Sequence, residues 1–243
     1  MKNLFVLEIK SNIGGRNMEI FPVIICDGKE MVLVDTGMPG FTELFKEEAK
    51  RKGINLDDLT KIVITHHDID HIGSLAEMKR TFKNVNVLSS EVEADYISGE
   101  KLSPRLEYMK NNYDKLPEER KQWYARIQET ANKLERITVD IVLKDNELIP
   151  GCSKIRAITT PGHLPGHMSV YAEESKTLVA GDALGYLDRK LFINSQNSMD
   201  LNQAKESVKK LLKLDIENIV CYHGGVFSGD CKKALQNILA IEN

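Results

Sequence analysis

Apolar runs of strand length, separated by turn residues, fill the early part of the chain. Three of them read as strands joined by tight turns, at residues 4–9, 20–28 and 31–37. A helix is predicted over about 42–52, because apolar residues recur there at a four-residue spacing and Gly53 follows as a stop signal. The pattern therefore predicts a β-meander that leads into a helix.

Strands and helices alternate through the rest of the chain, with one long interruption. Residues 62–65 form an apolar run typical of a strand that is buried on both faces. Residues 91–136 are polar, charged and without a strand pattern, so they are predicted to form two or three helices. The remaining expected elements are strands at 84–90, 137–143, 154–163, 169–174, 177–182 and 217–225 and helices near 74–81, 201–214 and 232–239.

This order of elements repeats in two similar halves and predicts an α/β fold of the αββα sandwich type. In such a fold two sheets pack face to face, with helices on the outside. No linker separates the halves, so residues 1–243 are interpreted as a single domain. Within it, residues 91–136 are expected to form a helical cap that sets substrate specificity.

Composition and charge narrow the class of protein. With 42% hydrophobic and 28% charged residues, the chain is typical of globular proteins. A net charge of -3 provides no basic excess for a phosphate backbone, and no apolar run approaches the roughly 18 residues of a membrane span. We therefore expect a small-molecule substrate, with no nucleic-acid and no membrane partner.

Cysteine usage and the first residues bear on location. The four cysteines are scattered without a CxxC pair, as suits reduced thiols, and none is assigned to a metal. The apolar run at the start is too short for a signal peptide, so a cytoplasmic location is expected. Homodimers are the commonest soluble assembly, and the sequence leaves a homodimer open.

Candidate chemistry is concentrated just after the buried strand at 62–65. The segment THHDIDHIG crowds together five imidazole and carboxylate side chains, those of His66, His67, Asp68, Asp70 and His71. Ionisable groups next to a buried strand are costly unless they are paired or bind a metal. Imidazole and carboxylate together suit Zn, Fe or Mn.

Three later strands end on similar side chains. TTPGHLPGH supplies His163 and His167, VAGDALGY supplies Asp182, and NIVCYHGG supplies His223. Each alone has an ordinary structural explanation, as a turn histidine or a helix N-cap. Because sheets of this kind gather functional residues at the carboxyl ends of their strands, the four clusters together predict one shared cleft.

These motifs resemble those of the metallo-β-lactamase superfamily, in order and over nearly the full length. The matching motifs are THxHxDH, TPGHTPGH, GD, a terminal strand with His, and an early DTG in LVDTGMPG at 33–40. The resemblance implies a metallo-β-lactamase-like αββα fold and a set of metal ligands: His66, Asp70, His71, His163, Asp182 and His223. It also implies that Asp182 bridges two ions, that His66 and His163 belong to the first site, and that Asp70, His71 and His223 belong to the second. Asp35 would orient the ligand loop, and His167 is expected to be a supporting residue.

One position departs from the family pattern. Where the family has its second histidine this chain has Asp68, and His67 stands at the variable position. A carboxylate there makes the first site more anionic and shifts its preference towards Fe or Mn without excluding Zn. The alternative is that His67 is the ligand and Asp68 lies beside it. The implied cofactors are two divalent ions, zinc first, with iron or manganese as alternatives.

The resemblance implies a dinuclear hydrolase in which a metal-bridging hydroxide attacks a small ester, thioester or lactone. Asp70 would orient the nucleophile and carry a proton to the leaving group. Tyr186 offers a hydrogen bond to the oxyanion as in the lactonase branch, although core packing is the favoured role for it.

Other activities stay open. Flavodiiron proteins carry a Glu at the position of Asp68, so an iron-dependent redox protein is one alternative; however, 243 residues leave no room for their flavodoxin domain. A phosphodiesterase and a non-catalytic metal-binding protein are further alternatives. A glutathione thioester is disfavoured, since only about 20 residues follow His223, whereas glyoxalase II relatives bind glutathione through a further helical domain.

Overall fold

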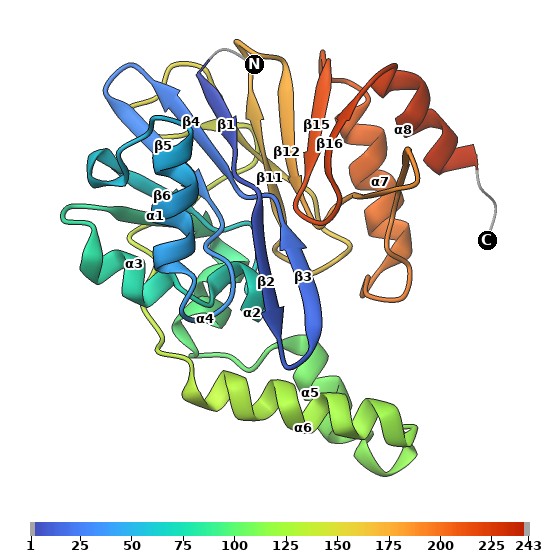
Figure 1. Cartoon of the computed structure of the whole chain (residues 1–243). Coiled ribbons are helices and arrows are strands. Elements are labelled where there is room, and N and C mark those ends of the chain that lie inside the picture. The colour runs from blue at the N-terminus through green and yellow to red at the C-terminus, as the bar shows by residue number, and fades with distance from the viewer. Residues whose placement is uncertain (1–2, 241–243) are drawn as a thin grey trace.

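Two six-stranded sheets form the centre of the computed structural model, which describes residues 3–240 (Figure 1). Strands follow the order β1-β4-β5-β6-β7-β8 in the first sheet and β16-β15-β12-β11-β10-β9 in the second. The first sheet comprises β1 (Leu4–Val6), β4 (Val23–Asp27), β5 (Glu30–Val34), β6 (Lys61–Val63), β7 (Asn86–Ser90) and β8 (Ile141–Leu143). The second comprises β9 (Glu147–Leu148), β10 (Ile155–Thr159), β11 (Met168–Ala172), β12 (Thr177–Gly181), β15 (Asn218–Cys221) and β16 (Gly225–Ser228).

Helices cover the outer face of each sheet (Figure 1). Against the first sheet lie α1 (Thr42–Arg51), the single turn α2 (Ile69–Ile72), α3 (Leu75–Thr81) and α4 (Glu91–Ser98). Against the second lie α7 (Leu201–Leu211) and α8 (Cys231–Ala240). Short 3-10 helices occur at Leu56–Asp58 and Tyr113–Lys115, and two hairpins, β2 (Ile9–Ile13) with β3 (Arg16–Ile20) and β13 (Gly185–Leu187) with β14 (Lys190–Phe192), lie outside the main sheets.

The buried apolar side chains fall into three layers that match this order. One layer joins α1 and α3 to the first sheet through residues such as Phe45 and Met78. The middle layer joins the two sheets, with Val34 and Val63 from the first and Val179 from the second. The third layer packs α7 and α8 on the second sheet. The predicted αββα sandwich is confirmed.

Parallel pairing brings the carboxyl ends of several strands to one edge. In the first sheet β5, β6, β7 and β8 are mutually parallel, with Val34 opposite Val63 and Val63 opposite Leu88. In the second sheet β12 and β15 are parallel, and β10 runs in the same direction because β11 is antiparallel to both β10 and β12. The segments that follow β5, β6, β10, β12 and β15 can therefore meet.

The segment 91–136 divides into two parts with different roles. Helix α4 belongs to the layer on the first sheet, since it contacts β7 and β8 and buries Glu93 and Ile97. Only α5 (Pro104–Asn111) and α6 (Glu118–Lys133) project below the sandwich, where the β2-β3 hairpin reaches towards them (Figure 1). These two helices are called the cap below, and they pack on each other through a small cluster around Leu106, Met109 and Tyr124.

Several strand predictions were wrong in detail. The run 4–9 ends at Val6, and the β2-β3 hairpin that follows was missed, because its half-exposed residues do not form a continuous apolar run. Pro22 separates β3 from β4, so the run from Ile20 is not one strand. Of residues 137–143 only Ile141–Leu143 pairs in the sheet.

The cysteines and the helices can also be compared with the sequence predictions. The four cysteines are free, and Cys152, Cys221 and Cys231 are buried. No helix within residues 3–240 is long and apolar enough to cross a lipid bilayer.

Candidate metal centre

A short loop and the single turn α2 place the first histidines of the site. Thr65 follows β6, and its backbone N–H donates to the Asp35 carboxylate over 2.8 Å. The Thr36 backbone N–H donates to the carbonyl of His71, also over 2.8 Å, which ties α2 to the end of β5. These contacts fix the loop at both ends and turn His66 and His71 inwards, where both are fully buried.

The seven predicted ligands come from three motifs and a terminal strand, and the structure brings all of them together. Three overlapping groups place candidate ligand atoms within 4.8 Å of one another: His66 with Asp68 and His163, His66 with His71 and Asp182, and Asp70 with His71 and His223. In the first group Asp68 Oδ2 lies 3.5 Å from His66 Nε2 and 3.2 Å from His163 Nε2. In the last group Asp70 Oδ2 lies 3.1 Å from His223 Nε2.

The Asp182 carboxylate lies between the two halves of this cluster. Its Oδ1 is 3.5 Å from His71 Nε2, and its Oδ2 is 3.6 Å from His163 Nε2 and 3.7 Å from His223 Nε2. One carboxylate is thus within reach of imidazoles from both outer groups.

Bound cations would explain the arrangement of these nitrogen and oxygen atoms better than hydrogen bonds among the side chains do. Within the described residues, His66 Nε2, His71 Nε2 and Asp182 Oδ1 are buried without a hydrogen-bond partner. Buried polar atoms are normally satisfied, so three orphans that converge on one point indicate a missing charged partner. A nitrogen and oxygen donor set of this kind suits Zn, Fe or Mn.

Burial and neighbouring charges shift the pKa values of the cluster in opposite directions. Although burial raises the pKa of Asp182, His223, His71 and His163 lower it well below 3.8. Burial alone would lower the pKa of His71, but Asp35, Asp182 and Asp70 raise it well above 6.5. The pKa of His223 is likewise raised, by Asp182 and Asp70 against the effect of burial. In the metal-free cluster both histidines therefore keep their protons to a higher pH than an ordinary imidazole does.

Metal uptake is accordingly expected to release protons and to strengthen as the pH rises. A cation binds only neutral imidazole, so it must displace the protons that His71 and His223 carry above their ordinary pKa. Calorimetric titration of metal-free protein with zinc at about pH 7, in buffers of different ionisation enthalpy, should show release of about one to two protons. A binding enthalpy that does not depend on the buffer would contradict the raised pKa values.

The same shift has a consequence for the stability of the metal-free protein. A folded-state pKa above 6.5 makes His71 stabilising at low pH, and this contribution is lost as the pH rises through the raised value. Thermal melting should therefore show that the stabilisation gained from added zinc grows on the alkaline side of about pH 6.5. Equal stabilisation by zinc at acid and at alkaline pH would contradict a raised pKa of His71.

Asp35 supports His71 from behind. Its Oδ2 accepts from His71 Nδ1 over 2.9 Å and from Thr65 Oγ1 over 2.9 Å, so the free Nε2 of His71 faces the cluster. Tyr222, which sequence reasoning missed, stacks on His71 with ring centroids 3.9 Å apart and donates to the carbonyl of Asp70 over 2.5 Å. Tyr222 directly precedes His223, and only this adjacency in the sequence could have pointed to it.

The structure distinguishes between His67 and Asp68. His67 turns away from the cluster: its Nδ1 lies 2.5 Å from Glu93 Oε2 and its Nε2 lies 3.0 Å from Ser103 Oγ. The His67 backbone N–H also donates to the same Glu93 oxygen over 2.9 Å. Because both ring nitrogens have partners, it is Asp68 that faces His66 and His163.

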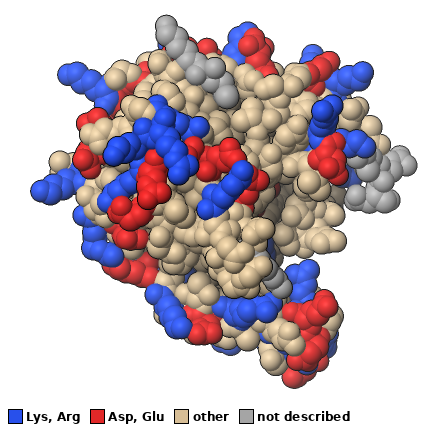
Figure 2. Space-filling model, in the orientation of Figure 1, with Lys and Arg blue, Asp and Glu red and all other residues tan. Residues whose placement is uncertain are grey.

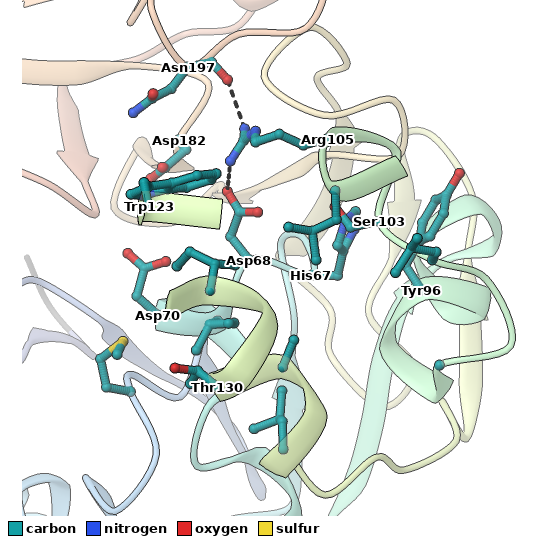
Figure 3. Close-up of a pocket in the computed structure, with 18 of the residues that line it drawn as sticks. His67, Asp68, Asp70, Tyr96, Ser103, Arg105, Trp123, Thr130, Asp182 and Asn197 are labelled. Carbon is teal, nitrogen blue, oxygen red and sulfur yellow. Dashed lines mark hydrogen bonds and ion pairs between the residues drawn. The ribbon is translucent and has the colours of Figure 1, made fainter. Parts of the chain in front are cut away.

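Arg105 in the cap reaches the cluster and was not among the predicted residues. Its guanidinium donates to Asp68 Oδ2 and to the carbonyl of Asn197, each over 2.8 Å (Figure 3). Burial would raise the pKa of Asp68, but Arg105, His163 and His66 lower it well below 3.8. Arg105 thus keeps this carboxylate ionised.

His167 and Tyr186 do not contribute atoms to the three groups of candidate ligands. His167 uses both nitrogens for support, since Nδ1 lies 2.9 Å from Thr160 Oγ1 and Nε2 accepts from the Asp182 backbone N–H over 3.0 Å. Burial lowers its pKa to about 3. Tyr186 packs its ring edge-on against Phe227, with centroids 5.7 Å apart, and does not line the cavity over the cluster. This placement favours packing over an oxyanion contact.

A cavity of about 660 Å³ opens over the cluster and reaches the cap. Asp68, Asp70, Asp182, His163 and His223 form its floor, and Trp123 and Arg105 from the cap form part of its roof (Figure 3). This volume is within the range of small-molecule binding sites.

An αββα sandwich that gathers histidines and carboxylates at one strand edge is an arrangement that could hold metal ions. The chain belongs to the Metallo-beta-lactamase superfamily, whose sequence profile matches residues 20–223. It is 27% identical over 215 residues to "Probable metallo-hydrolase YflN" of Bacillus subtilis, a match that covers 82% of this chain and 76% of that protein.

Two further similar proteins support less, one because the match covers only part of it and the other because its sequence identity is low. Hydroxyacylglutathione hydrolase of Bartonella henselae is 28% identical over 68% of this chain, but the match covers only 49% of that enzyme. The crystal structure of a metallo-beta-lactamase family protein from Thermus thermophilus superposes with a TM-score of 0.74 at 22% identity, covering 99% of this chain and 79% of that one. The latter likeness shows the shared fold.

Proposed function

We propose that this protein is a dinuclear metal-dependent hydrolase of a small ester, thioester or lactone. The observation that carries the proposal is the shared position of Asp182, whose two oxygens face imidazoles of both outer groups while Oδ1 has no other partner. His66, Asp68 and His163 would hold one ion, Asp70, His71 and His223 the other, and Asp182 would contact both. Two such ions would supply an activated water and a Lewis acid for the carbonyl oxygen.

The chain's own residues would prepare and complete the reaction. Asp70 Oδ2 lies on the cavity floor 3.1 Å from His223 Nε2, where it can orient the attacking water and accept its proton. The same carboxyl group can then pass the proton to the leaving oxygen or sulfur. The cap covers part of the cavity and would limit the entry of bulk water.

The proposal is tested by metal analysis together with substrate assays. Protein purified without added metal should contain close to two ions per chain and should hydrolyse at least one of a nitrocefin, lactone, thioester and bis-nitrophenyl phosphate set. Turnover of the phosphate diester alone would instead support a phosphodiesterase. Full metal content without any turnover would contradict the hydrolase, and oxygen-dependent redox cycling of bound iron would replace it with the redox alternative.

A matched pair of variants tests which residue completes the first site. Asp68→Ala should lower the metal content to about one ion per chain, because it removes one of the four groups proposed to face that position, the others being His66, His163 and the shared Asp182. His67→Gln should keep both ions, because His67 faces Glu93 and Ser103, and a glutamine still donates to Glu93. Elemental analysis after dialysis measures both. The reverse pattern, with the ion lost only in His67→Gln, would make His67 the ligand.

A further inference from the structure

A serine, a histidine and a glutamate that the proposed hydrolysis does not use form a continuous hydrogen-bonded series beside the metal centre. His67 Nε2 lies 3.0 Å from Ser103 Oγ, and His67 Nδ1 lies 2.5 Å from Glu93 Oε2. Because a carboxylate accepts hydrogen bonds, a neutral His67 ring carries its proton on Nδ1, and its Nε2 can accept from the Ser103 hydroxyl. The order hydroxyl, imidazole and carboxylate is the one that activates a serine in hydrolases of several unrelated folds.

The histidine ring is held in this orientation from several sides. Glu93 is fully buried, and its Oε2 also accepts from the His67 backbone N–H over 2.9 Å. Tyr96 packs against the His67 ring, with ring centroids 4.6 Å apart (Figure 3). His67 itself is buried. Because its neighbours fix the ring, its Nε2 stays directed at Ser103.

Ser103 stands at a position where a serine side chain normally has a different partner. It directly precedes α5, and a serine there usually accepts from backbone N–H groups of the first helical turn. The Ser103 side chain makes no such capping hydrogen bond. Its hydroxyl is directed at His67 instead, which leaves the backbone N–H groups of Arg105 and Leu106 uncapped by it. Such N–H groups can stabilise a negative oxygen on a group that is bound to Oγ.

The Ser103 hydroxyl can be reached from the cavity. Ser103 is half-buried, and it lines the cavity over the metal centre together with His67. The outside of the cap, in contrast, carries charged side chains of both signs (Figure 2). Ser98 lines the same cavity, but its hydroxyl donates to the carbonyl of Asp95 over 3.1 Å instead of to an imidazole. A small molecule in the cavity therefore meets two serines, of which Ser103 is the one with a base beside it.

We propose that Ser103 is a second nucleophile of this cavity, which accepts acyl groups from small carboxylic esters or thioesters without the help of a metal. Ser103 Oγ bonds to the acyl carbon, the bond to the leaving oxygen or sulfur breaks, and the hydroxyl proton passes through His67 Nε2 to that leaving atom. The products are an acyl ester of Ser103 and a free alcohol or thiol. His67 contacts the reacting hydroxyl as its base, and Glu93 positions the ring. This acyl transfer does not depend on the proposed metal-dependent hydrolysis.

A fluorophosphonate tests the nucleophile directly on the purified full chain. In this reaction Ser103 Oγ bonds to phosphorus, fluoride leaves, and the hydroxyl proton passes to His67. Mass spectrometry should find a single phosphonyl group per chain, and peptide mapping should place it on Ser103 and not on Ser98. The same label should form on protein that a chelator has freed of metal and whose melting curve shows that it is folded. Absence of the label, a label on another serine, or a label that forms only with metal would overturn the proposal.

Variants then assign the reactivity to the named residues. His67→Gln should lower the rate of labelling by about 100-fold or more, because a general base is lost, although this variant is expected to keep both ions. Ser103→Ala should lose the label, and it removes no capping hydrogen bond from α5. Ser198→Ala is the matched control, since Ser198 donates to the carbonyl of Asn194 over 2.9 Å and does not line this cavity. Equal rates of labelling in His67→Gln and in the unmodified protein would contradict activation by His67.

An acyl ester tests the transfer itself and separates it from the proposed function. Metal-free protein mixed with 4-nitrophenyl acetate should release about one equivalent of 4-nitrophenol in an initial burst, and Ser103 should gain an acetyl group. The burst should be absent from Ser103→Ala and present in Ser198→Ala. If the metal-containing protein hydrolyses esters but Ser103 is never acetylated, this inference fails and the hydrolase stands. If Ser103 is acetylated but the metal-containing protein turns over no ester, the hydrolase fails and this inference stands.

Discussion

Replacement of Asp182 by alanine is expected to abolish hydrolysis. This carboxylate is the one group whose oxygens lie within 3.7 Å of His71, His163 and His223, so both proposed ions depend on it. Without its negative charge two neighbouring cations would repel each other in a largely buried site. Loss of a residue that merely orients a metal ligand costs about 10–100-fold in affinity or activity, so loss of a shared ligand should exceed about 100-fold in kcat/KM.

The measurement combines steady-state kinetics with metal analysis. Asp182→Ala should contain at most one ion per chain and should show no measurable turnover of any ester that the unmodified protein hydrolyses. Asp114→Ala is a suitable control, because Asp114 is an exposed carboxylate in the short 3-10 helix between α5 and α6 and takes no part in the cluster. If Asp182→Ala kept two ions and its activity, the proposal that Asp182 contacts both ions would be wrong.

The strand ends could be predicted from the sequence because each motif carries its own local signal. Asp182 follows a buried apolar run directly, and His163 and His223 each lie close after one, so the end of the strand and the polar residue are visible in the same short window. General rules of sheet topology then bring such ends to one edge. No knowledge of side-chain contacts is needed for that step.

The sequence placed Asp68 among the ligands but could not exclude His67 in this way. Both lie in the same short loop, and the residue that decides between them, Glu93, stands 26 positions later on another helix. Glu93 is fully buried and would commonly be read as a solvated charge on a polar helix. Arg105 was missed for the same reason, since its partner Asp68 is 37 positions away and a lone arginine in a polar segment has no distinguishing pattern.

The boundaries of the cap could not be predicted from the sequence either. Residues 91–98 and 104–133 are both helical and polar, so periodicity alone does not separate the helix that packs on the sheet from those that project beyond it. The difference lies in tertiary packing: Ile97 is buried in the core under α4, whereas Leu106 and Tyr124 form a separate small cluster.

Asp35→Asn should impair the second metal position without removing any ligand. Asp35 Oδ2 accepts from His71 Nδ1, so when His71 is neutral its single proton stays on Nδ1 and Nε2 can bind a cation. An asparagine that keeps the contact of Oδ1 with the Thr65 N–H would turn its amide NH₂ towards His71. The imidazole would then accept at Nδ1 and carry its proton on Nε2, the atom that faces Asp182. A protonated nitrogen cannot coordinate, so zinc affinity should fall by about 10–100-fold.

Competition titration against a chelating dye measures this loss, and activity assays at increasing zinc distinguish its cause. If the tautomer is responsible, saturating zinc should restore much of the activity of Asp35→Asn, because metal binding can shift the proton back at a cost in affinity. Asp35→Ala leaves His71 buried without its carboxylate and should instead be destabilised by about 3–5 kcal/mol, seen as a lower melting temperature that zinc restores only partly. Unchanged zinc affinity in Asp35→Asn would show that the hydrogen bond from His71 to Asp35 does not determine which ring nitrogen of His71 carries the proton.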